Sequence, residues 1–273
     1  MMKTRHFLLF LLLSGAFVLS SALHRSAFSQ EDDWLEFYYI EPTPERFVEE
    51  MKAWASDGTL DNEFARPALI SFLSRIIREN RDQIRNWYTE LAGLTPEQKQ
   101  VLHTAMLFAR VSEADEIMTE TFGKQYHEQR VETQKILEMP LDKASTMDML
   151  WGFFYATGSE TPIRRIILSF RFEEAPDDPD GVEVPKGYLP LYKDLPNFAF
   201  DSLVANAERH PRLIDILEKL LREDTSLLQE EKRAVYDVLS EMKPGTYPPI
   251  DWQKVDEERR MLEELEEIEK ESI

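Results

Sequence analysis

Histidine is the residue type in this chain best suited to metal binding, and its spacing fits no zinc site. Beyond residue 29 the sequence contains only His103, His127 and His210. A zinc-protease helix carries a second histidine four residues after the first, but residue 131, four after His127, is valine. The other two histidines lie in separate predicted helices, so the sequence predicts no metal site and no bound cofactor.

The sequence also lacks the motifs of nucleophilic and phosphate chemistry. It contains no cysteine, no G-x-S-x-G elbow and no glycine-rich phosphate loop. The segment 178–181 resembles the middle of a calcium-binding loop, but two of the ligand positions would be Pro176 and Gly187. We interpret this segment as a solvated turn. The alternative is a looser cation site formed by the nearby acids Asp177, Asp178, Asp180 and Glu183.

Paired carboxylates are the one catalytic arrangement that the composition leaves open. The chain contains 52 acidic residues, and glycoside hydrolases place two carboxylates on opposite sides of the bond that they cleave. Separation and burial decide whether such a pair is catalytic, and neither follows from the sequence. A cell-wall-directed helical hydrolase is therefore the enzymatic alternative to a binding protein, and no catalytic residue is predicted.

The most distinctive segment is the aromatic block from Trp151 to Gly158, which reads WGFFYATG. As a helix it carries aromatic side chains on all sides, which predicts burial between two helical layers. Gly152 would let a second backbone approach this helix closely. The alternative is an aromatic groove for a peptide or a sugar, with Tyr155, Tyr188 and Tyr192 as the expected surface residues.

The spacing of apolar residues predicts helices along most of the chain. Apolar residues recur three, four and seven positions apart, as in the segment 147–154. Strand-like alternation of polar and apolar residues is nearly absent. The sequence therefore predicts an all-α protein of roughly ten to twelve helices joined by short turns.

Several helix starts are also predicted by capping residues. Threonine followed by proline indicates a start at Thr43, Thr95 and Thr161, since the hydroxyl caps free N–H groups and proline suits the first turn. Reciprocal capping-box spacing occurs in the segments 95–98 and 226–229.

The first 29 residues predict a secretory signal peptide. Two basic residues precede the apolar run Phe7–Leu19, which leads to small residues. Cleavage is expected after Ser29, with cleavage after Ala22 as the alternative. The apolar run is too short to span a bilayer, and a chain without cysteine cannot carry a lipid at a processed cysteine. The protein is therefore predicted to be periplasmic or secreted, with no stable membrane anchor after cleavage.

The net charge of the chain restricts the classes of molecule that it is expected to bind. The formal net charge is 32 − 52 = −20, and removal of residues 1–29, which contain three basic residues and no acid, makes it 29 − 52 = −23. Such a surface repels the phosphates of nucleic acids and anionic lipids. We therefore expect a protein or peptide partner and no nucleic acid.

Beyond residue 29 the chain divides into four parts at a proline-rich segment and at its acidic end. These are an N-terminal helical domain (30–171), a Pro/Asp-rich loop (172–197), a C-terminal helical repeat (198–249) and an acidic helical tail (250–273). Residues 71–106 resemble residues 202–239 in the spacing of apolar and basic positions. This predicts stacked helical hairpins in an α-solenoid, similar in character to tetratricopeptide or HEAT repeats. Because prolines precede the tail and its apolar stripe is narrow, we expect the tail to fray.

Several segments resemble a little-studied family of exported, all-helical bacterial proteins. They are Phe37–Tyr39, Pro42–Phe47, Phe72–Ser74, Asp148–Gly158 and Ser202–Pro211. The resemblance covers about residues 34–241; it implies export and a helical-hairpin fold, and no activity or site residue. The leading hypothesis is an exported helical-repeat binding or scaffold protein that engages a protein or peptide partner without catalysis.

Overall fold

The computed structural model describes residues 34–172 and 194–271, without the side chains of residues 266–271. Within these ranges every regular element is a helix, so the all-α prediction is confirmed. The α-helices are α2 (Trp34–Phe37), α3 (Phe47–Asp57), α4 (Arg66–Glu79), α5 (Ile84–Glu90), α6 (Pro96–Ala109), α7 (Ser112–Phe122), α8 (Lys124–Glu132), α9 (Ala144–Thr157), α10 (Glu160–Ile167), α11 (Leu195–Ala207), α12 (Pro211–Glu223), α13 (Gln229–Met242) and α14 (Trp252–Glu271). Short 3-10 helices are η1 (Pro44–Arg46), η2 (Thr59–Asp61), η3 (Arg81–Gln83), η4 (Ile136–Glu138) and η5 (Leu168–Phe172).

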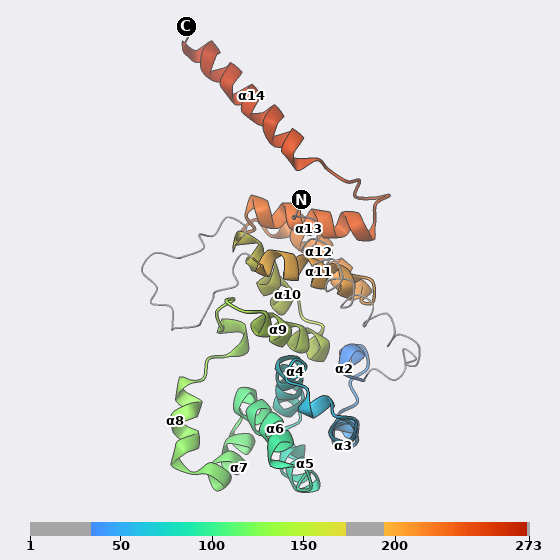
Figure 1. Ribbon diagram of the computed structural model, residues 1–273, viewed down its shortest axis with the longest axis vertical. Helices are drawn as coiled ribbons and strands as arrows, with labels where there is room; N and C mark the ends of the chain where they lie inside the picture. Colours follow the sequence, from blue (N-terminus) through green and yellow to red (C-terminus); the bar gives the residue numbers. More distant parts are fainter. Residues whose placement is uncertain (1–33, 173–193, 272–273) are drawn as a thin grey trace, which may run out of the picture.

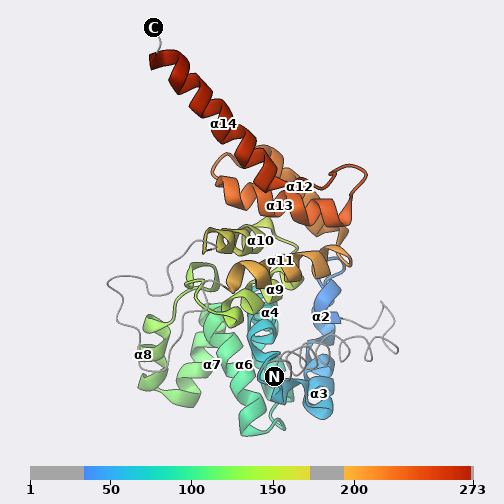
Figure 2. The same ribbon diagram turned by 45° about the horizontal axis from the view of Figure 1, so that its top comes forward.

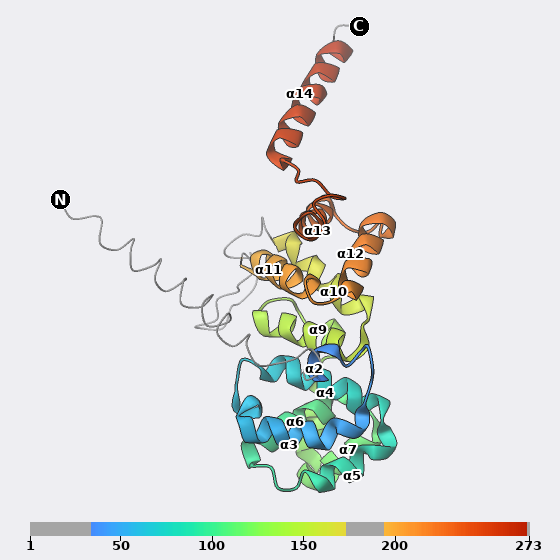
Figure 3. The same ribbon diagram turned by 90° about the vertical axis from the view of Figure 1, so that its right-hand side faces the viewer.

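The helices are stacked along one long axis of the molecule (Figure 1). Helices α3, α5, α6, α7 and α8 form one end, and α4 lies between this end and α9. Helices α10 to α13 follow above α9, as the turned view in Figure 3 also shows. Helix α14 projects from the α13 end away from the body (Figures 1 and 2).

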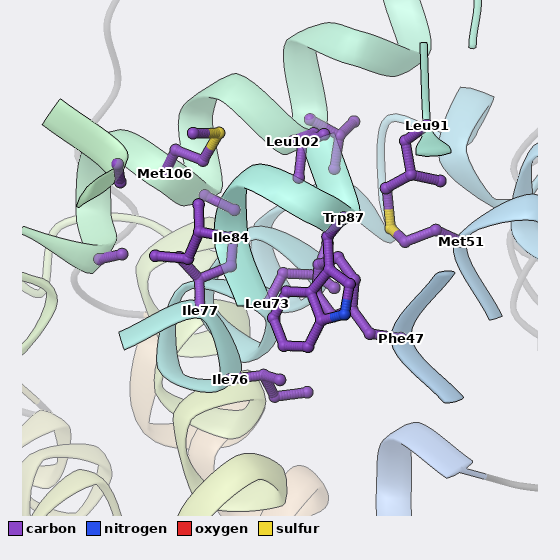
Figure 4. Close-up of a cluster of buried hydrophobic side chains, with 14 of the residues drawn as sticks. Phe47, Met51, Leu73, Ile76, Ile77, Ile84, Trp87, Leu91, Leu102 and Met106 are labelled. Carbon is purple, nitrogen blue, oxygen red and sulfur yellow. The ribbon is translucent and has the colours of Figure 1, made fainter. Parts of the chain in front are cut away.

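The core at the N-terminal end is built by the apolar faces of α3 to α7. Phe47 stacks on Trp87 with ring centroids 4.2 Å apart. The same cluster contains Leu73 and Ile77 of α4 and Met106 of α6, and all five side chains are buried (Figure 4). The apolar spacing of each helix thus lies on the face that packs inward.

The second core joins α9 and α10 to α11, α12 and α13. Leu150 and Phe154 of α9 belong to it, whereas Ala156 of the same helix belongs to the first core. The two cores therefore meet at α9. The segment 173–193, which holds most of the predicted Pro/Asp-rich loop, lies outside the described residues. The described part of this region places Leu195 and Pro196 in the first turn of α11, although the predicted loop extends to residue 197.

Helix α9 has no exposed residue and most of its side chains are buried, as the aromatic block predicts. Trp151 is 5% exposed and Phe154 is fully buried. On another side of the helix, Gly152 packs against the backbone of Ala68 in α4, the close approach that the glycine predicts. Gly158 then ends the helix with φ +57°, and an added Cβ there would meet the ring of Tyr39. The glycine is needed both for the left-handed turn and for the space.

The predicted helix starts have mixed outcomes. The capping box of Thr95 and Gln98 is confirmed, with Gln98 N donating to Thr95 Oγ1 at 3.3 Å and Thr95 N to Gln98 Oε1 at 3.2 Å. The start at Thr161 is wrong because Ser159 caps α10 and Thr161 lies within it. The predicted box at 226–229 is also wrong, since α13 begins one residue after Leu228, whose N–H donates to Glu231.

The predicted start at Thr43 is confirmed in position, since η1 begins at Pro44, but not in its capping hydrogen bond. Thr43 caps no N–H group and precedes the short helix η1. Its hydroxyl instead accepts a hydrogen bond of 2.9 Å from Trp34 Nε1, which ties α2 to the start of η1. The threonine is therefore used for a tertiary contact.

The expectation that the prolines leave the tail free of α13 is wrong for its first turn, and fraying of the residues beyond that turn stays a prediction. Helix α14 is continuous from Trp252 to Glu271, and its first turn docks on α13. Trp252 Nε1 donates to Asp237, at 2.9 Å and 3.0 Å to the two carboxylate oxygens. The Arg233 guanidinium lies 5.0 Å from the Trp252 ring centroid and pairs with Asp256 at 2.7 Å. These contacts anchor the base of the helix across the prolines at 244–249.

Candidate functional site

A buried histidine links the first described helix to the turn between α11 and α12. His210 is fully buried, and its Nδ1 lies 3.2 Å from the hydroxyl of Tyr39. Its Nε2 lies 3.1 Å from Glu36 Oε1, although the ring nitrogen is not aimed well enough at the oxygen to form a regular hydrogen bond. Glu36 also pairs with Arg209 at 2.5 Å. This group is called the His210 junction below.

Aromatic rings surround the imidazole of His210, which is fully buried. The His210 ring lies between 5.0 Å and 5.7 Å, centroid to centroid, from the rings of Phe37, Tyr39, Phe154 and Tyr155. Burial raises the pKa of Tyr39, which keeps its hydroxyl protonated. A substrate cannot reach a fully buried imidazole, so we interpret the junction as a structural joint.

The tyrosines predicted for an aromatic groove are distributed differently. Tyr155 is half-buried; its ring faces His210, and its hydroxyl donates to Asn206 Oδ1 at 2.6 Å. Its main-chain oxygen accepts a hydrogen bond of 3.0 Å from Tyr39 N. Tyr188 and Tyr192 lie outside the described residues. The structure therefore brings Tyr155 into the His210 junction and gives no position for the other two.

A hollow of about 500 Å³ between α6, α7 and α8 is a better candidate for a binding site. It is called the α6–α8 groove below. Its floor is apolar and consists of Leu107, Met118 and Tyr126, which are at most 4% exposed. The remaining lining residues are mostly polar: Pro96, Lys99, Gln100, His103, Thr104, Thr121, Phe122, Gln125 and Gln129. An apolar floor with convergent polar groups is the common composition of a binding pocket.

Hydrogen bonds at the floor of the α6–α8 groove join α8 to α7. The Tyr126 hydroxyl donates a short hydrogen bond to Asp115, which also accepts from Arg130 Nε at 3.1 Å. Burial and the neighbouring Asp115 raise the pKa of Tyr126, so its hydroxyl stays protonated. These bonds link α7 to α8 next to the groove.

One wall of the groove carries an aromatic and imidazole cluster. Phe122 is 42% exposed, and its ring packs edge-on against His103 with centroids 4.9 Å apart. His103 Nε2 lies 3.2 Å from the Tyr88 hydroxyl, which lies 3.3 Å from Thr121 Oγ1. Burial, with a smaller contribution from Lys99, lowers the pKa of His103 and favours its neutral form. A neutral imidazole and an exposed phenyl ring suit recognition rather than charge pairing.

The chemistry of the groove is that of hydrogen bonding. Three glutamine amides, Gln100, Gln125 and Gln129, offer both donors and acceptors. Among the described residues that line the groove there is no carboxylate, and Lys99 is the only charged side chain. No single residue type marked this site in the sequence, because its groups lie on three helices and only tertiary packing brings them together.

A second hollow, of about 560 Å³, lies between η5, α11, α13 and the base of α14. It bears on the hydrolase alternative because Glu230 and Asp237 both line it. Both lie on α13, seven residues apart, and Asp237 already accepts from Trp252. Carboxylates on one helix face do not flank a bond from opposite sides as a glycosidase pair does.

The buried acids of the described chain are neutralised by arginines. Glu36 pairs with Arg209, and Glu231 forms two hydrogen bonds to Arg171. Each carboxylate thus already has an arginine partner. Neither lines one of the two hollows described above.

In the part of the chain that the structure describes, no three histidine, aspartate or glutamate side chains form a metal-binding group. His103 and His127 each contact a hydroxyl group, of Tyr88 and Thr119 respectively. None of the helices in the described ranges combines the length and the apolar character needed to cross a bilayer.

Comparison with protein-family models, with curated proteins and with solved structures finds no match to this chain. The resemblance drawn from the sequence therefore gives no family, and the function is argued from the geometry of the groove.

Proposed function

We propose that the chain is an exported, non-catalytic helical binding protein that holds a segment of a protein or peptide partner in the α6–α8 groove. The observation that carries this proposal is the composition of the groove. An exposed phenyl ring, Phe122, stands beside a buried apolar floor, and glutamine amides surround both.

An extended polypeptide has the matching chemistry. Its main chain presents one donor and one acceptor per residue, and glutamine side chains pair with both. One or two apolar side chains of the partner would occupy the floor at Leu107 and Met118, next to Phe122. Aromatic residues at the centre of an interface commonly supply most of the binding energy.

The order of the helices supports a repeated architecture. Three consecutive helices, α4, α5 and α6, lie before α9 in the chain, and three more consecutive helices, α11, α12 and α13, lie after it. The sequence match at 71–106 and 202–239 falls on these two sets. We propose that they are related units of a solenoid-like stack, in which α9 joins one set to the other.

The compartment is part of the same proposal. The basic and apolar order of residues 1–29 supports export to the periplasm or beyond. A net charge of −20 over the whole chain supports solubility and repels nucleic acids.

Site-specific photo-crosslinking in the native envelope tests the groove. A photo-crosslinking phenylalanine replaces Gln125, which lines the groove, and in a control variant it replaces Phe64, which is 82% exposed and lies outside it. We expect one dominant polypeptide adduct from position 125 and not from position 64, and its loss when Phe122→Ser is added. Equal adducts at both positions, or an adduct indifferent to Phe122→Ser, would reject the groove as the binding site.

A further inference from the structure

The distal half of α14 leaves apolar side chains uncovered on adjacent turns. Met261, Leu262 and Leu265 are 56%, 61% and 61% exposed. On the body, the large apolar residues that are similarly exposed occur singly, as at Phe64 and Val131. A contiguous exposed apolar patch is characteristic of an interaction surface.

This patch is carried away from the body on a fixed base. The contacts of Trp252 with Asp237 and of Arg233 with Asp256 hold the first turn of α14 on α13. Beyond this turn the helix extends into solvent (Figures 1 and 2). The residues 261–271 form the segment called the arm below.

The charge around the apolar patch restricts what can cover it. From Met261 to Glu271 the sequence contains six acids and one base, which gives 1 − 6 = −5. Anionic lipid headgroups would be repelled, and so would the arm of a second copy of this chain. A helix with its own apolar stripe bordered by lysine and arginine is complementary in both respects.

We infer that the arm is a docking site for a basic amphipathic helix of another protein. Leu262 and Leu265 pack against the partner's apolar stripe, and glutamates such as Glu263 and Glu264 face its basic flanks. Helices that bury apolar stripes against each other are a recurrent mode of recognition. This interaction uses a surface separate from the α6–α8 groove and does not depend on the function proposed for that groove.

The test uses residues 30–273, which include every described residue, and a labelled synthetic 21-residue helix. The peptide has leucine at the a and d positions and lysine at the e and g positions of each heptad. Two matched peptides carry glutamate in place of lysine, or serine in place of leucine. Fluorescence anisotropy at about 0.15 M salt, where charges further apart than about 8 Å are screened, measures the affinity.

We expect saturable binding of the leucine-lysine peptide alone. The double variant Leu262→Ser/Leu265→Ser should weaken it at least about tenfold, since each buried leucine contributes on that scale. The control Phe64→Ser, at an apolar residue that is 82% exposed on the body, should leave it unchanged.

Three results would overturn the inference. The first is absence of binding, and the second is equal affinity of the double variant, which would indicate adsorption to the acidic surface in general. The third is a dimer of the free protein in sedimentation that Leu262→Ser/Leu265→Ser abolishes, which would make a second copy the occupant. Because these residues are largely exposed, circular dichroism should show the double variant folded.

Discussion

Gly152 of α9 touches the backbone of Ala68 in α4, and the two helices cross there without an intervening side chain. A Cβ built on Gly152 would lie 2.0 Å from the Ala68 carbonyl oxygen and 2.8 Å from its carbonyl carbon. These atoms belong to a helix backbone, which cannot rotate away as a side chain can. The crossing of α4 and α9 therefore requires glycine at position 152.

Gly152→Ala should consequently destabilise the protein. Overpacking of a well-packed interior costs about 1–3 kcal/mol, and this contact lies at the upper end because backbone must move. Urea unfolding measures the loss. The control is Gly93→Ala, in open space after α5, which should change the free energy of unfolding by less than about 0.5 kcal/mol. Equal stability of the two variants would contradict the close crossing.

Trp151→Ala should cost about 3–5 kcal/mol, because truncation of a large buried aromatic side chain loses its transfer energy and leaves a cavity. Trp151 is 5% exposed in the second core. Phe64→Ala removes an aromatic ring that is 82% exposed and should cost under about 0.5 kcal/mol. A loss well below 1 kcal/mol for Trp151→Ala in urea unfolding would mean that α9 is open to solvent.

Asp148 should give the protein a measurable pH dependence. Burial raises its pKa from 3.8 to about 6, so the folded state binds this proton more tightly than the unfolded state. The stabilisation is complete below the unfolded pKa and is lost as pH rises through about 6. Asp148→Asn lacks this titrating carboxyl group. Its free energy of unfolding should therefore increasingly exceed that of the natural chain as pH rises from about 4 to about 7, by on the order of 1–2 kcal/mol at the upper end.

Urea midpoints of both proteins across this pH range measure the effect. The difference between the two proteins matters, because the many other acids contribute equally to each. A constant difference at every pH would contradict a buried, uncompensated Asp148.

Two changes to α14 should separate its anchored base from its projecting arm. Deletion of residues 257–273 removes no contact of Trp252 with α13 and should shift the thermal midpoint by less than about 2 °C. Trp252→Ala removes the hydrogen bond to Asp237 and the cation–π contact with Arg233, and should lower the midpoint by several degrees. Differential scanning calorimetry distinguishes the two. A large drop on deletion would show that the arm itself packs on the body.

Export can be checked by N-terminal sequencing of the protein recovered from the envelope or the medium. The mature chain should begin at Gln30, or at Leu23 if cleavage follows Ala22. An intact terminus at Met1 or Met2 on exported protein would reject the signal peptide.

The sequence predicts most reliably those structural features that depend on residues close together in the chain. The capping box of Thr95 and Gln98 closes within one helical turn, so its spacing is sufficient evidence. Thr161 fails as a helix start because Ser159, two residues earlier, caps the same helix. Gly152 and Trp151 are predicted correctly because an all-round apolar helix has one stable environment, the space between two layers.

Polar contacts between residues far apart in the chain could not be predicted from the sequence around either residue. His210 has the sequence surroundings of an ordinary polar helix residue, yet it is fully buried beside Glu36 and Tyr39, which are far away in the chain. The α6–α8 groove could not be predicted for the same reason, since Phe122 and His103 come into contact only when α6 and α7 pack together. Trp252 anchors α14 through Asp237, fifteen residues earlier and across a proline-rich turn, so the helix pattern alone could not predict the docking.

The hydrogen bond between Tyr39 and His210 spans 171 positions of the chain. A chain that emerges from the ribosome with its N-terminus first cannot complete this joint until nearly four-fifths of it has been made. Contacts of such high sequence separation slow folding, because a long loop must close before they form. The contacts of His210 with Tyr39 and Glu36 therefore form late in synthesis, whereas Trp34, which lies in helix α2 with Glu36, packs on Phe72, which is made much earlier.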